Sequence, residues 1–487
     1  MILVVDVGTT GLRAALVAPD TTLAATDYRP FPPETPFPGL VEFDATRMAE
    51  LVLDAAAAVL ATAGGPEITA VGIANQRAST IVWDRATGRP VGPGLGWQDL
   101  RTVGECITLK AEHGFPLAPN QSATKLAWLL ANAAADRDPS DLCFGTVDTW
   151  VAWTLSGGAL HITDHTNAAV TGLYSVERAG WHEGVCEVLG IPTSMLPTIV
   201  DSCGTVGHAS ELPGAPPIGG IVGDQQGSLV GQGCVQPGRA KVTFGTGGML
   251  DVCTGARPPE RSHRSEHGTF PIVAWAAGGE LTWGVEAVML SAGTNVEWLR
   301  DDLGLIEDAA SSHDVAAACE TTEGVTYVPA LLGLGTPRWD YGARGTLLGI
   351  TRGTERRHVV RAVLEGIAHR GADLVEAAEA DTGLTIPVVR VDGGMSRNPT
   401  FVQALADATG KPVEVSPVVD STTLGAGFLA GVATGTWTGL DDTAQAWSPI
   451  STVDPRPEVD RPTERAAWAS AVERAAGWIP ELSALDF

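Results

Sequence analysis

Two short segments of this sequence combine the residue types that can hold a phosphate group. Residues 4–11 (VVDVGTTG) run from an apolar stretch into a turn of glycine and threonine, and residues 244–248 (FGTGG) repeat the pattern near the middle of the chain. Backbone N–H groups and hydroxyls in such a turn can face a phosphate, and glycine lets the backbone come close. One such turn is common in tight hairpins, where Gly8 and Gly11 would only supply positive φ angles. The recurrence of the turn favours phosphate binding.

Two aspartates could supply the rest of a phosphoryl-transfer site. Asp224 follows Val222-Gly223, and a carboxylate at the end of a strand can accept the proton of an attacking hydroxyl. Its alternative role is the N-cap of a helix that starts at Gln225, and the spacing by itself favours that role. Asp6 could hold Mg²⁺ through water, because Mg²⁺ prefers oxygen ligands and keeps much of its hydration shell. Two phosphate-binding turns and one base are the parts that move a phosphoryl group from a nucleotide to an alcohol.

Further residues could contact a nucleotide or an acceptor molecule. Arg13 would add positive charge beside the first turn. The paired glycines of residues 392–394 (DGG) could admit a purine or a phosphate, and Asn398 follows them, although Asn398 before Pro399 is also a good helix N-cap. Trp97 comes after a glycine-rich loop, and its ring would suit the C–H face of a polyol, although tryptophans are more often core residues.

Several common nucleotide and metal motifs do not occur in the sequence. Residues 410–412 (GKP) have proline where a Walker A loop needs serine or threonine, and no GxGxxG motif follows the first apolar stretch. His161 and His165 have the spacing of a metal-binding pair, but no third ligand is nearby. A P-loop NTPase, a dinucleotide-binding enzyme and a metal site at these histidines are therefore not expected.

The composition limits the partners and the compartment. The formal net charge of −26 disfavours nucleic acid and anionic membrane surfaces, since both attract lysine and arginine. The seven cysteines include no CxxC pair, which argues against a disulfide framework and favours a reducing compartment. The N-terminal apolar run is too short for a signal peptide, and no stretch approaches a membrane span. We therefore expect a soluble, cytoplasmic protein.

The elements that must position these residues alternate between strands and helices, which indicates an α/β fold with a partly parallel sheet. Strands are expected at residues 2–7, 13–18, 68–74, 241–244, 249–253 and 388–391, and helices at residues 45–60, 125–134, 146–155, 358–380 and 399–409. A chain of 487 residues is too long for one core, and each half begins with a hairpin that carries a glycine–threonine turn. We expect two related domains, residues 1–233 and 234–487, with ligands in the cleft between them. Residues 211–220, rich in proline and glycine, are expected to be a loop before the crossover.

Taken together, these motifs resemble those of the FGGY carbohydrate kinases, and within that family they are most similar to those of the glycerol kinases. The resemblance extends from residue 2 to about residue 437. The stretches that carry it are residues 72–77 (GIANQR), 96–102 (GWQDLRT), 147–150 (VDTW), 163–168 (TDHTNA), 223–226 (GDQQ), 333–340 (GLGTPRWD) and 392–394 (DGG).

The resemblance implies two actin-like (RNase H-like) domains with a catalytic cleft between them, which close over ATP, Mg²⁺ and a small sugar or polyol. It implies that Asp224 is the catalytic base and that Asp6 helps to place Mg²⁺. The residues implied for the substrate are Arg77, Ala78, Trp97, Asn120, Asp224, Gln225 and Met249. Those implied for ATP are Thr9, Thr10, Arg13, Thr246, Gly293, Glu297, Gly394 and Asn398. Phosphoryl transfer depends on positioning and charge neutralisation more than on covalent chemistry, which agrees with such a site.

The sequence departs from the glycerol kinase pattern mainly where the substrate would bind. Ala78 stands in place of a glutamate, Asn120 in place of a tyrosine and Met249 in place of a phenylalanine. Losing a carboxylate removes a hydrogen-bond acceptor and losing two rings widens the pocket, so an acceptor somewhat larger than glycerol is expected. Glu297 replaces a glutamine near the nucleotide. Residues 211–214 (ELPG) replace a basic loop that binds fructose bisphosphate in some bacterial relatives, so that inhibition is not expected.

The resulting hypothesis is ATP-dependent phosphorylation of a hydroxyl of a small polyol or sugar. The acceptor is expected to be a polyol somewhat larger than glycerol, or a ketose. Two alternatives stay open: a pentulose kinase such as a xylulokinase, and a non-catalytic actin-like module that binds ATP and senses a sugar. The second would not need Arg77, Trp97 and residues 224–225 together, which favours the kinase. The sequence leaves the substrate, any regulator and the oligomeric state open, and a homodimer is the assembly considered.

Overall fold

The computed structural model describes residues 1–485, and its centre is a sheet of 13 strands. In the first half of the chain the strand order is β3–β2–β1–β5–β14. These strands are β1 (Ile2–Val7), β2 (Gly11–Val17), β3 (Leu23–Pro30), β5 (Ala70–Asn75) and β14 (Pro217–Gly223). β1, β2 and β3 are antiparallel neighbours, whereas β5 and β14 run parallel to β1.

The second half repeats this arrangement in the order β18–β16–β15–β21–β22. These strands are β15 (Ala240–Phe244), β16 (Gly248–Gly255), β18 (Glu280–Met289), β21 (Val389–Asp392) and β22 (Val413–Val415). β15, β16 and β18 are antiparallel neighbours, and β21 and β22 run parallel to β15. In both halves, the hairpin with the glycine–threonine turn borders the parallel strands. The expected α/β fold with two units of related build is thus confirmed.

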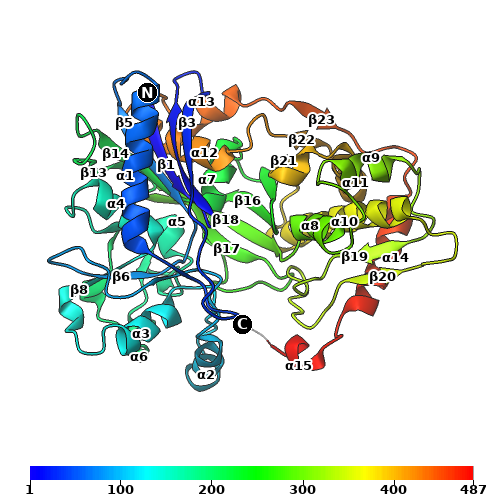
Figure 1. The fold of residues 1–487 in the computed structure, drawn as a ribbon, viewed down its shortest axis with the longest axis horizontal. Coiled ribbons are helices and arrows are strands. Elements are labelled where there is room, and N and C mark those ends of the chain that lie inside the picture. The colour runs from blue at the N-terminus through cyan, green and yellow to red at the C-terminus, as the bar shows by residue number, and fades with distance from the viewer. Residues whose placement is uncertain (486–487) are drawn as a thin grey trace.

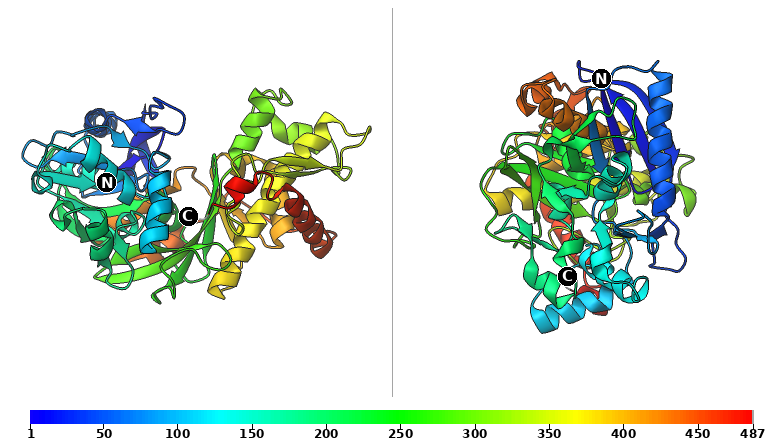
Figure 2. Two further views of the ribbon diagram at one scale, coloured as in Figure 1. Left: turned by 90° about the horizontal axis from the view of Figure 1, so that it is seen from below. Right: turned by 90° about the vertical axis from the view of Figure 1, so that its left-hand side faces the viewer.

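The two sets of strands form one continuous sheet. β17 (Phe270–Ala277) pairs with β18 and meets β13 (Cys203–His208) through Cys203 and Ala277, and β13 pairs with β14. β23 (Ser451–Val453) lies at the edge beside β22. Figure 1 and Figure 2 show the two halves of the molecule on either side of the green central strands.

Helices cover both sets of strands, and short strands fill the connections. The helices are α1 (Ala45–Thr62), α2 (Val103–His113), α3 (Ala123–Asn132), α4 (Val147–Leu155), α5 (His165–Ala168), α6 (Glu183–Val188), α7 (Asp224–Gly231), α8 (Gly293–Asp301), α9 (Ser311–Ala317), α10 (Arg356–Thr382), α11 (Pro399–Thr409), α12 (Ser421–Ala433), α13 (Leu440–Ala446), α14 (Arg461–Ala475) and α15 (Pro480–Ser483). The short strands are β4 (Glu42–Phe43), β6 (Ile81–Asp84), β7 (Gly94–Leu95), β8 (Leu142–Gly145), β9 (Ile162–Asp164), β10 (Tyr174–Ser175), β11 (Gly180–Trp181), β12 (Thr198–Val200), β19 (Thr326–Val328) and β20 (Thr346–Leu348). Within residues 1–485, no helix combines the length and the apolar character that a membrane crossing needs.

Alternating apolar residues give each set of strands a core on the face that its helices cover. Leu3 and Val5 of β1 share one core with α1 and α4, and Val242 and Phe244 of β15 share another with α10 and α11. α1 begins after Asp44, whose carboxylate accepts hydrogen bonds from the first-turn N–H groups. These helices leave the opposite faces of both sets of strands to be covered from the middle of the molecule.

Two helices, α7 and α12, fill that middle space. α12 follows the second set of strands in the chain, yet it packs on β1, β5 and β14 of the first set. The helices approach so closely that a Cβ on Gly425 of α12 would lie 1.9 Å from the carbonyl oxygen of Gly227 in α7. On the other side of α12, a Cβ on Gly72 of β5 would lie 2.6 Å from the carbonyl oxygen of Ala426. Glycine at these positions therefore lets backbone pack directly on backbone.

Most elements lie where the sequence predicts them, with ends that differ by a few residues. The strand expected at residues 2–7 is β1, and the helix expected at residues 358–380 is α10, which is longer by a turn in total. The segment at residues 211–220 is not a loop throughout, because β14 already begins at Pro217 and pairs there with β13.

Candidate active site

The first glycine–threonine turn joins β1 to β2. The Gly8 N–H donates to the carbonyl oxygen of Gly11 at 2.9 Å, which closes the turn. The alternative in which Gly8 and Gly11 only supply positive φ angles is wrong, because neither lies in the left-handed region. Glycine at position 11 instead allows a close approach, since a Cβ there would lie 2.8 Å from the backbone carbonyl oxygen of Arg29. Thr9 is half-buried and Thr10 is exposed, so the turn can present both to a ligand.

Asp6 lies at the end of β1 among other charged side chains. It is opposite Arg13 in the β1–β2 register, and the Thr423 hydroxyl of α12 donates to Asp6 Oδ2 at 2.9 Å. Burial raises the pKa of the Asp6 carboxyl to about 6, against the opposing effects of Thr423 and Arg13. Arg13 is itself held by Asp420 before α12, with 2.6 Å between Nη1 and Oδ1. The start of α12 thus restrains both the carboxylate and the cation of the first turn.

Trp97 connects the substrate candidates to the first turn. Its indole Nε1 donates to the hydroxyl oxygen of Thr9 at 3.1 Å. Lys125 of α3 is buried behind this loop and donates to the carbonyl oxygens of Gly96 and Pro119, both at 3.1 Å. It also donates to the carbonyl oxygen of Trp97 at 3.3 Å. Lys125 thus connects the loop at residues 96–97 to the loop at Pro119. Burial lowers the pKa of its ammonium to about 7, so the charge of this connecting group is lost more easily than that of an exposed lysine.

Asp224 is the first residue of α7, and the N-cap is Gly223. The capping role that the spacing favours for Asp224 is therefore not the one it has. Its Oδ1 accepts from the adjacent Gln225 N–H at 2.8 Å and lies 3.3 Å from Nε of Arg77. Burial raises the pKa of the Asp224 carboxyl above its usual range, against the attraction of Arg77. A carboxylate that is fixed through one oxygen and 30% exposed can accept a proton from a bound hydroxyl.

The Arg77 guanidinium lies at the centre of a polar cluster between the two halves. Its Nη2 lies 2.7 Å from Glu286 Oε2 on β18, and its Nη1 donates to Gln226 Oε1 at 3.3 Å. Burial raises the pKa of the Glu286 carboxyl to about 7, against the attraction of Arg77. Because Arg77 follows β5 of the first half and Glu286 belongs to β18 of the second half, this cluster connects the two halves of the molecule.

The three residues that depart from the glycerol kinase pattern have different surroundings. Ala78 is buried with a φ of 60°, a left-handed backbone that is uncommon for residues with a Cβ. Its carbonyl oxygen accepts from the Ser122 hydroxyl at 3.0 Å. Met249 is half-buried on β16, and Asn120 is exposed before α3. Within residues 1–485, no hydrogen bond connects these three residues to one another.

The second glycine–threonine turn rests on the start of α8. The Gly293 N–H donates to the carbonyl oxygen of Gly245, and the Ala292 N–H to that of Thr246, both at 2.8 Å. A Cβ on Gly293 would lie 2.6 Å from the Gly245 carbonyl oxygen, so glycine permits this contact. Thr246 and Gly293 thereby lie close together, while Glu297 is exposed one turn further along α8, and the contact of these residues with a nucleotide stays a prediction.

The remaining nucleotide candidates follow β21. Gly394 is exposed, and a Cβ there would meet nothing within 4 Å. Asn398 caps α11, since its Oδ1 accepts from the Phe401 N–H at 3.1 Å, and its Nδ2 donates to Ser312 at 2.9 Å. The capping role of Asn398 is confirmed, and its contact with a nucleotide stays a prediction.

Comparison with known proteins identifies the family to which this arrangement belongs. The sequence matches the N-terminal domain of the FGGY family of carbohydrate kinases over residues 1–231 and the C-terminal domain of that family over residues 240–434. The chain belongs to the FGGY carbohydrate kinases. It is 41% identical to the glycerol kinase of Aromatoleum aromaticum, over 98% of this chain and 99% of that protein. It is 39% identical to the glycerol kinase of Deinococcus radiodurans, over 98% of each chain.

Solved structures of a glycerol kinase and a xyloylose kinase have the same fold as this kinase. A Plasmodium falciparum glycerol kinase crystallised with ADP superimposes with a TM-score of 0.90 at 30% identity, covering 98% of both chains. A xyloylose kinase from Brucella ovis superimposes with a TM-score of 0.85 at 25% identity, covering 99% of both chains. The ATP-dependent phosphorylation of a carbohydrate that the motifs predict is thus confirmed at the level of the family.

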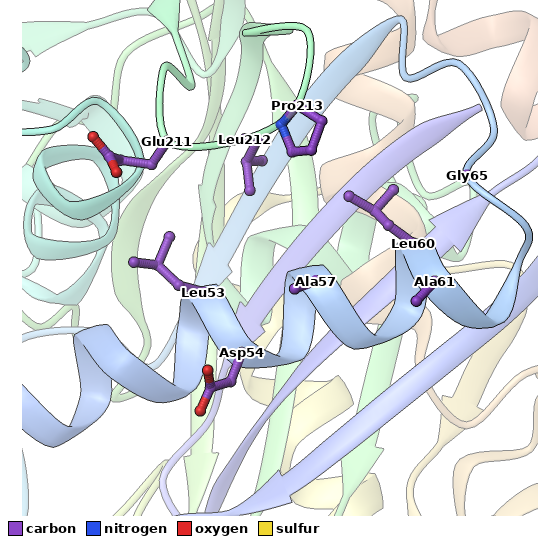
Figure 3. A pocket seen from close by; sticks show the side chains of 9 residues that line it. All are labelled: Leu53, Asp54, Ala57, Leu60, Ala61, Gly65, Glu211, Leu212 and Pro213. Atoms are coloured by element: carbon purple, nitrogen blue, oxygen red, sulfur yellow. The ribbon is translucent and has the colours of Figure 1, made fainter.

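A hollow on the outer face of this FGGY kinase lies away from these residues. It has a volume of about 490 Å³ and lies between α1 and residues 211–213 (Figure 3). Its walls include apolar side chains such as Leu53 and Leu60, and its charged side chains, Asp54 and Glu211, are both acidic. No lysine or arginine lines it, so its lining offers a bisphosphate no basic partner.

Several polar residues of the site are not among the candidates from the sequence. The Thr422 hydroxyl donates to the carbonyl oxygen of Asp224 at 3.0 Å, beside the Thr423 contact with Asp6. The partners of this last pair are 417 positions apart, and no local pattern predicts such a contact. Lys241 of β15 also belongs to the site, because its Nζ donates to Gln225 Oε1 at 2.6 Å. The sequence could have indicated this residue, since a charged residue among the apolar residues of a strand marks a face that is not part of the apolar core.

Proposed function

We propose that this kinase transfers the γ-phosphoryl group of ATP to a hydroxyl of a small polyol or ketose. The acceptor hydroxyl attacks the phosphorus in line while Asp224 takes its proton. The observation that supports this most is the restraint of Asp224 at the start of α7, where Thr422 holds its backbone and Arg77 holds one carboxylate oxygen. The raised pKa of Asp224 agrees with a base that must bind a proton during transfer.

The first turn and Asp6 fit Mg²⁺ that arrives with ATP. Among residues 1–485, no group of three or more His, Cys, Asp or Glu side chains could hold a metal ion by itself. Mg²⁺ in kinases commonly takes one or two carboxylates together with phosphate oxygens and water, and Asp6 offers one carboxylate beside the turn. We therefore propose that Asp6 holds Mg²⁺ only when ATP is bound, where the ion would neutralise charge on the transferred group.

For the acceptor, we propose a polyol or ketose somewhat larger than glycerol. Ala78 has only a methyl group where the glutamate of the glycerol kinase pattern would accept hydrogen bonds. Met249 has a narrower and more flexible side chain than the phenylalanine of that pattern. The 41% identity with a glycerol kinase makes glycerol the first compound against which such an acceptor must be compared.

A panel of C3–C6 polyols and ketoses, with ADP release followed by a coupled assay, tests both parts of the proposal. The highest kcat/KM is expected for an acceptor of more than three carbons. Glycerol as clearly the best acceptor would contradict the size argument and leave the kinase assignment intact. A pentulose as the best acceptor would favour the xylulokinase alternative, and ADP release that no acceptor stimulates would favour the non-catalytic sensor.

The oligomeric state is a separate part of the proposal. A homodimer stays a prediction, and the molar mass in solution, measured by light scattering with and without ATP, checks it.

A further inference from the structure

A buried row of charged side chains crosses three strands beneath α7. The row consists of Lys241 on β15, Asp251 on β16 and Glu286 on β18. Lys241 is opposite Asp251 in the β15–β16 register, and Asp251 is opposite Glu286 in the β16–β18 register. Side chains opposite each other in neighbouring strands share one face of a sheet, so the row lies on the face toward α7, away from the apolar core.

Lys241 fixes the orientation of the Gln225 side chain. Its Nζ donates to Gln225 Oε1 at 2.6 Å and to the Thr243 hydroxyl oxygen at 3.1 Å. An ammonium has no acceptor, so the amide oxygen and not the NH₂ group of Gln225 must face it. The NH₂ group is left for another partner, and it donates to no group within the described residues 1–485. Gln225 is half-buried next to Asp224, so this donor lies beside the proposed base.

Asp251 forms an ion pair with Lys241, although its own carboxylate lacks hydrogen bonds from the described part of the chain. Its side chain is fully buried, with Oδ2 2.7 Å from Lys241 Nζ, yet neither carboxylate oxygen accepts a hydrogen bond of good geometry within residues 1–485. A buried carboxylate is normally both paired and hydrogen-bonded. With Asp224 and Glu286 the cluster holds three carboxyl groups against the two cations Arg77 and Lys241, so the loss of either cation would leave a further buried carboxyl group without a partner.

We propose that Lys241 and Asp251 are positioning residues of the acceptor site, which act by holding the Gln225 amide with its NH₂ group toward the acceptor. This inference rests on the proposed function. Gln225 then recognises a lone pair on the acceptor, which a hydroxyl or a carbonyl oxygen can supply. A polyol and a ketose of the same length would both satisfy this contact, whereas a deoxy analogue without that oxygen would not.

A double-mutant cycle tests whether Lys241 acts through Gln225. The variants are Gln225→Ala, the pair Lys241→Met/Asp251→Leu, and all three substitutions together. Removing the pair as a unit avoids leaving one buried charge without its partner. KM for the best acceptor of the C3–C6 panel is expected to rise roughly tenfold in each of the first two, as for the loss of one hydrogen bond. The combined variant is expected to rise no further, with KM for ATP unchanged in all three.

A matched control comes from the same sheet. Arg390 and Glu414 form another cross-strand pair, on β21 and β22, with 3.0 Å between Nε and Oε2. The double variant Arg390→Met/Glu414→Leu is expected to lower Tm without changing KM for the acceptor. Effects of Gln225→Ala and of the Lys241–Asp251 replacement that multiply in the combined variant would overturn the inference, as would an unchanged acceptor KM in the pair replacement.

A second variant keeps the inference testable if the pair replacement does not fold. Gln225→Glu keeps an oxygen for Lys241 but removes the NH₂ donor. Its Tm is expected to fall, because the new carboxylate adds negative charge to the cluster, while its acceptor KM rises about tenfold. An acceptor KM equal to that of the natural chain would overturn the inference. Absence of acceptor-stimulated ADP release in the natural chain would instead overturn the proposed function, before any variant is compared.

Discussion

Asp224 is restrained at its backbone and at one carboxylate oxygen, and these contacts leave the rest of the carboxylate for chemistry. Thr422 of α12 holds its carbonyl oxygen, while the Gln225 N–H and Arg77 hold Oδ1. The side chain is 30% exposed, so a bound hydroxyl can reach it. In the proposed mechanism, restraint of this kind would hold the base in position before the acceptor hydroxyl binds, without a rearrangement at the moment of transfer.

Replacing Asp224 by asparagine tests its role as the base. Asparagine keeps the size and an oxygen for the Gln225 N–H, but it cannot take a proton, so kcat is expected to fall by about 10²–10⁴. The Kd for ADP, measured by calorimetry, is expected to stay within about twofold, because the turns and not Asp224 would bind the nucleotide. Asp54→Asn on the exposed side of α1 is the control. A kcat near that of the natural chain would refute the base assignment.

At the level of elements, the sequence predicts what is local and misses what depends on contacts distant in sequence. The β1 hairpin, the Asp44 cap and the Asn398 cap follow from neighbouring residues, and all are confirmed. The Thr423–Asp6 and Lys241–Gln225 contacts depend on how α7 and α12 pack between the two sets of strands, which no short pattern encodes. For the same reason, the site residues were predicted as separate groups, without the polar cluster around Arg77 that connects them.

The contact between α7 and α12 predicts a position that tolerates no side chain. Gly425→Ala would place a Cβ 1.9 Å from the Gly227 carbonyl oxygen. The nearest atoms are all backbone atoms of α7, so the overlap cannot be relieved by rotating a side chain. Although alanine favours a helix, the overlap is expected to destabilise the protein by about 1–3 kcal/mol and to lower Tm. Because α12 carries Thr422 and Thr423 into the site, kcat is also expected to fall.

Gly439→Ala is the matched control for this substitution. Gly439 has an extended backbone and a Cβ there would meet nothing within 4 Å, so scanning calorimetry is expected to show an unchanged Tm. Equal Tm values for the two variants would show that α12 can shift away from α7 at no cost.

For the whole molecule, buried carboxyls make stability depend on pH. Burial and the nearby Asp164 raise the pKa of the Asp148 carboxyl to about 7, against hydroxyl donors from Thr146 and Thr163. In the unfolded chain the same carboxyl titrates near its ordinary value of 3.8. Between about pH 4 and pH 7 the folded state therefore holds a proton that the unfolded state has lost, and stability falls as the pH rises through this window.

Asp148→Asn is expected to remove this part of the pH dependence. One carboxyl contributes a slope of up to about 1.4 kcal/mol per pH unit, so the decline in Tm from pH 5 to pH 7 is expected to be smaller in the variant. Scanning calorimetry at half-unit steps measures it, with the exposed Asp54→Asn as the control. A variant whose Tm declines as steeply as that of the natural chain would show that Asp148 is ionised throughout this range.

The position of α12 also has a consequence for synthesis on the ribosome. One face of the sheet made by β1, β5 and β14 is covered by this helix, whose contacts include Gly72 and Gly220. Because chains emerge from the N-terminus, the first half must wait, with that face unsealed, until residue 433 has left the exit tunnel. Nascent chains halted shortly after residue 233 should therefore be more sensitive to protease and more dependent on chaperones than the full-length chain after its release. The first half of this kinase therefore completes its packing only when most of the second half has been synthesised.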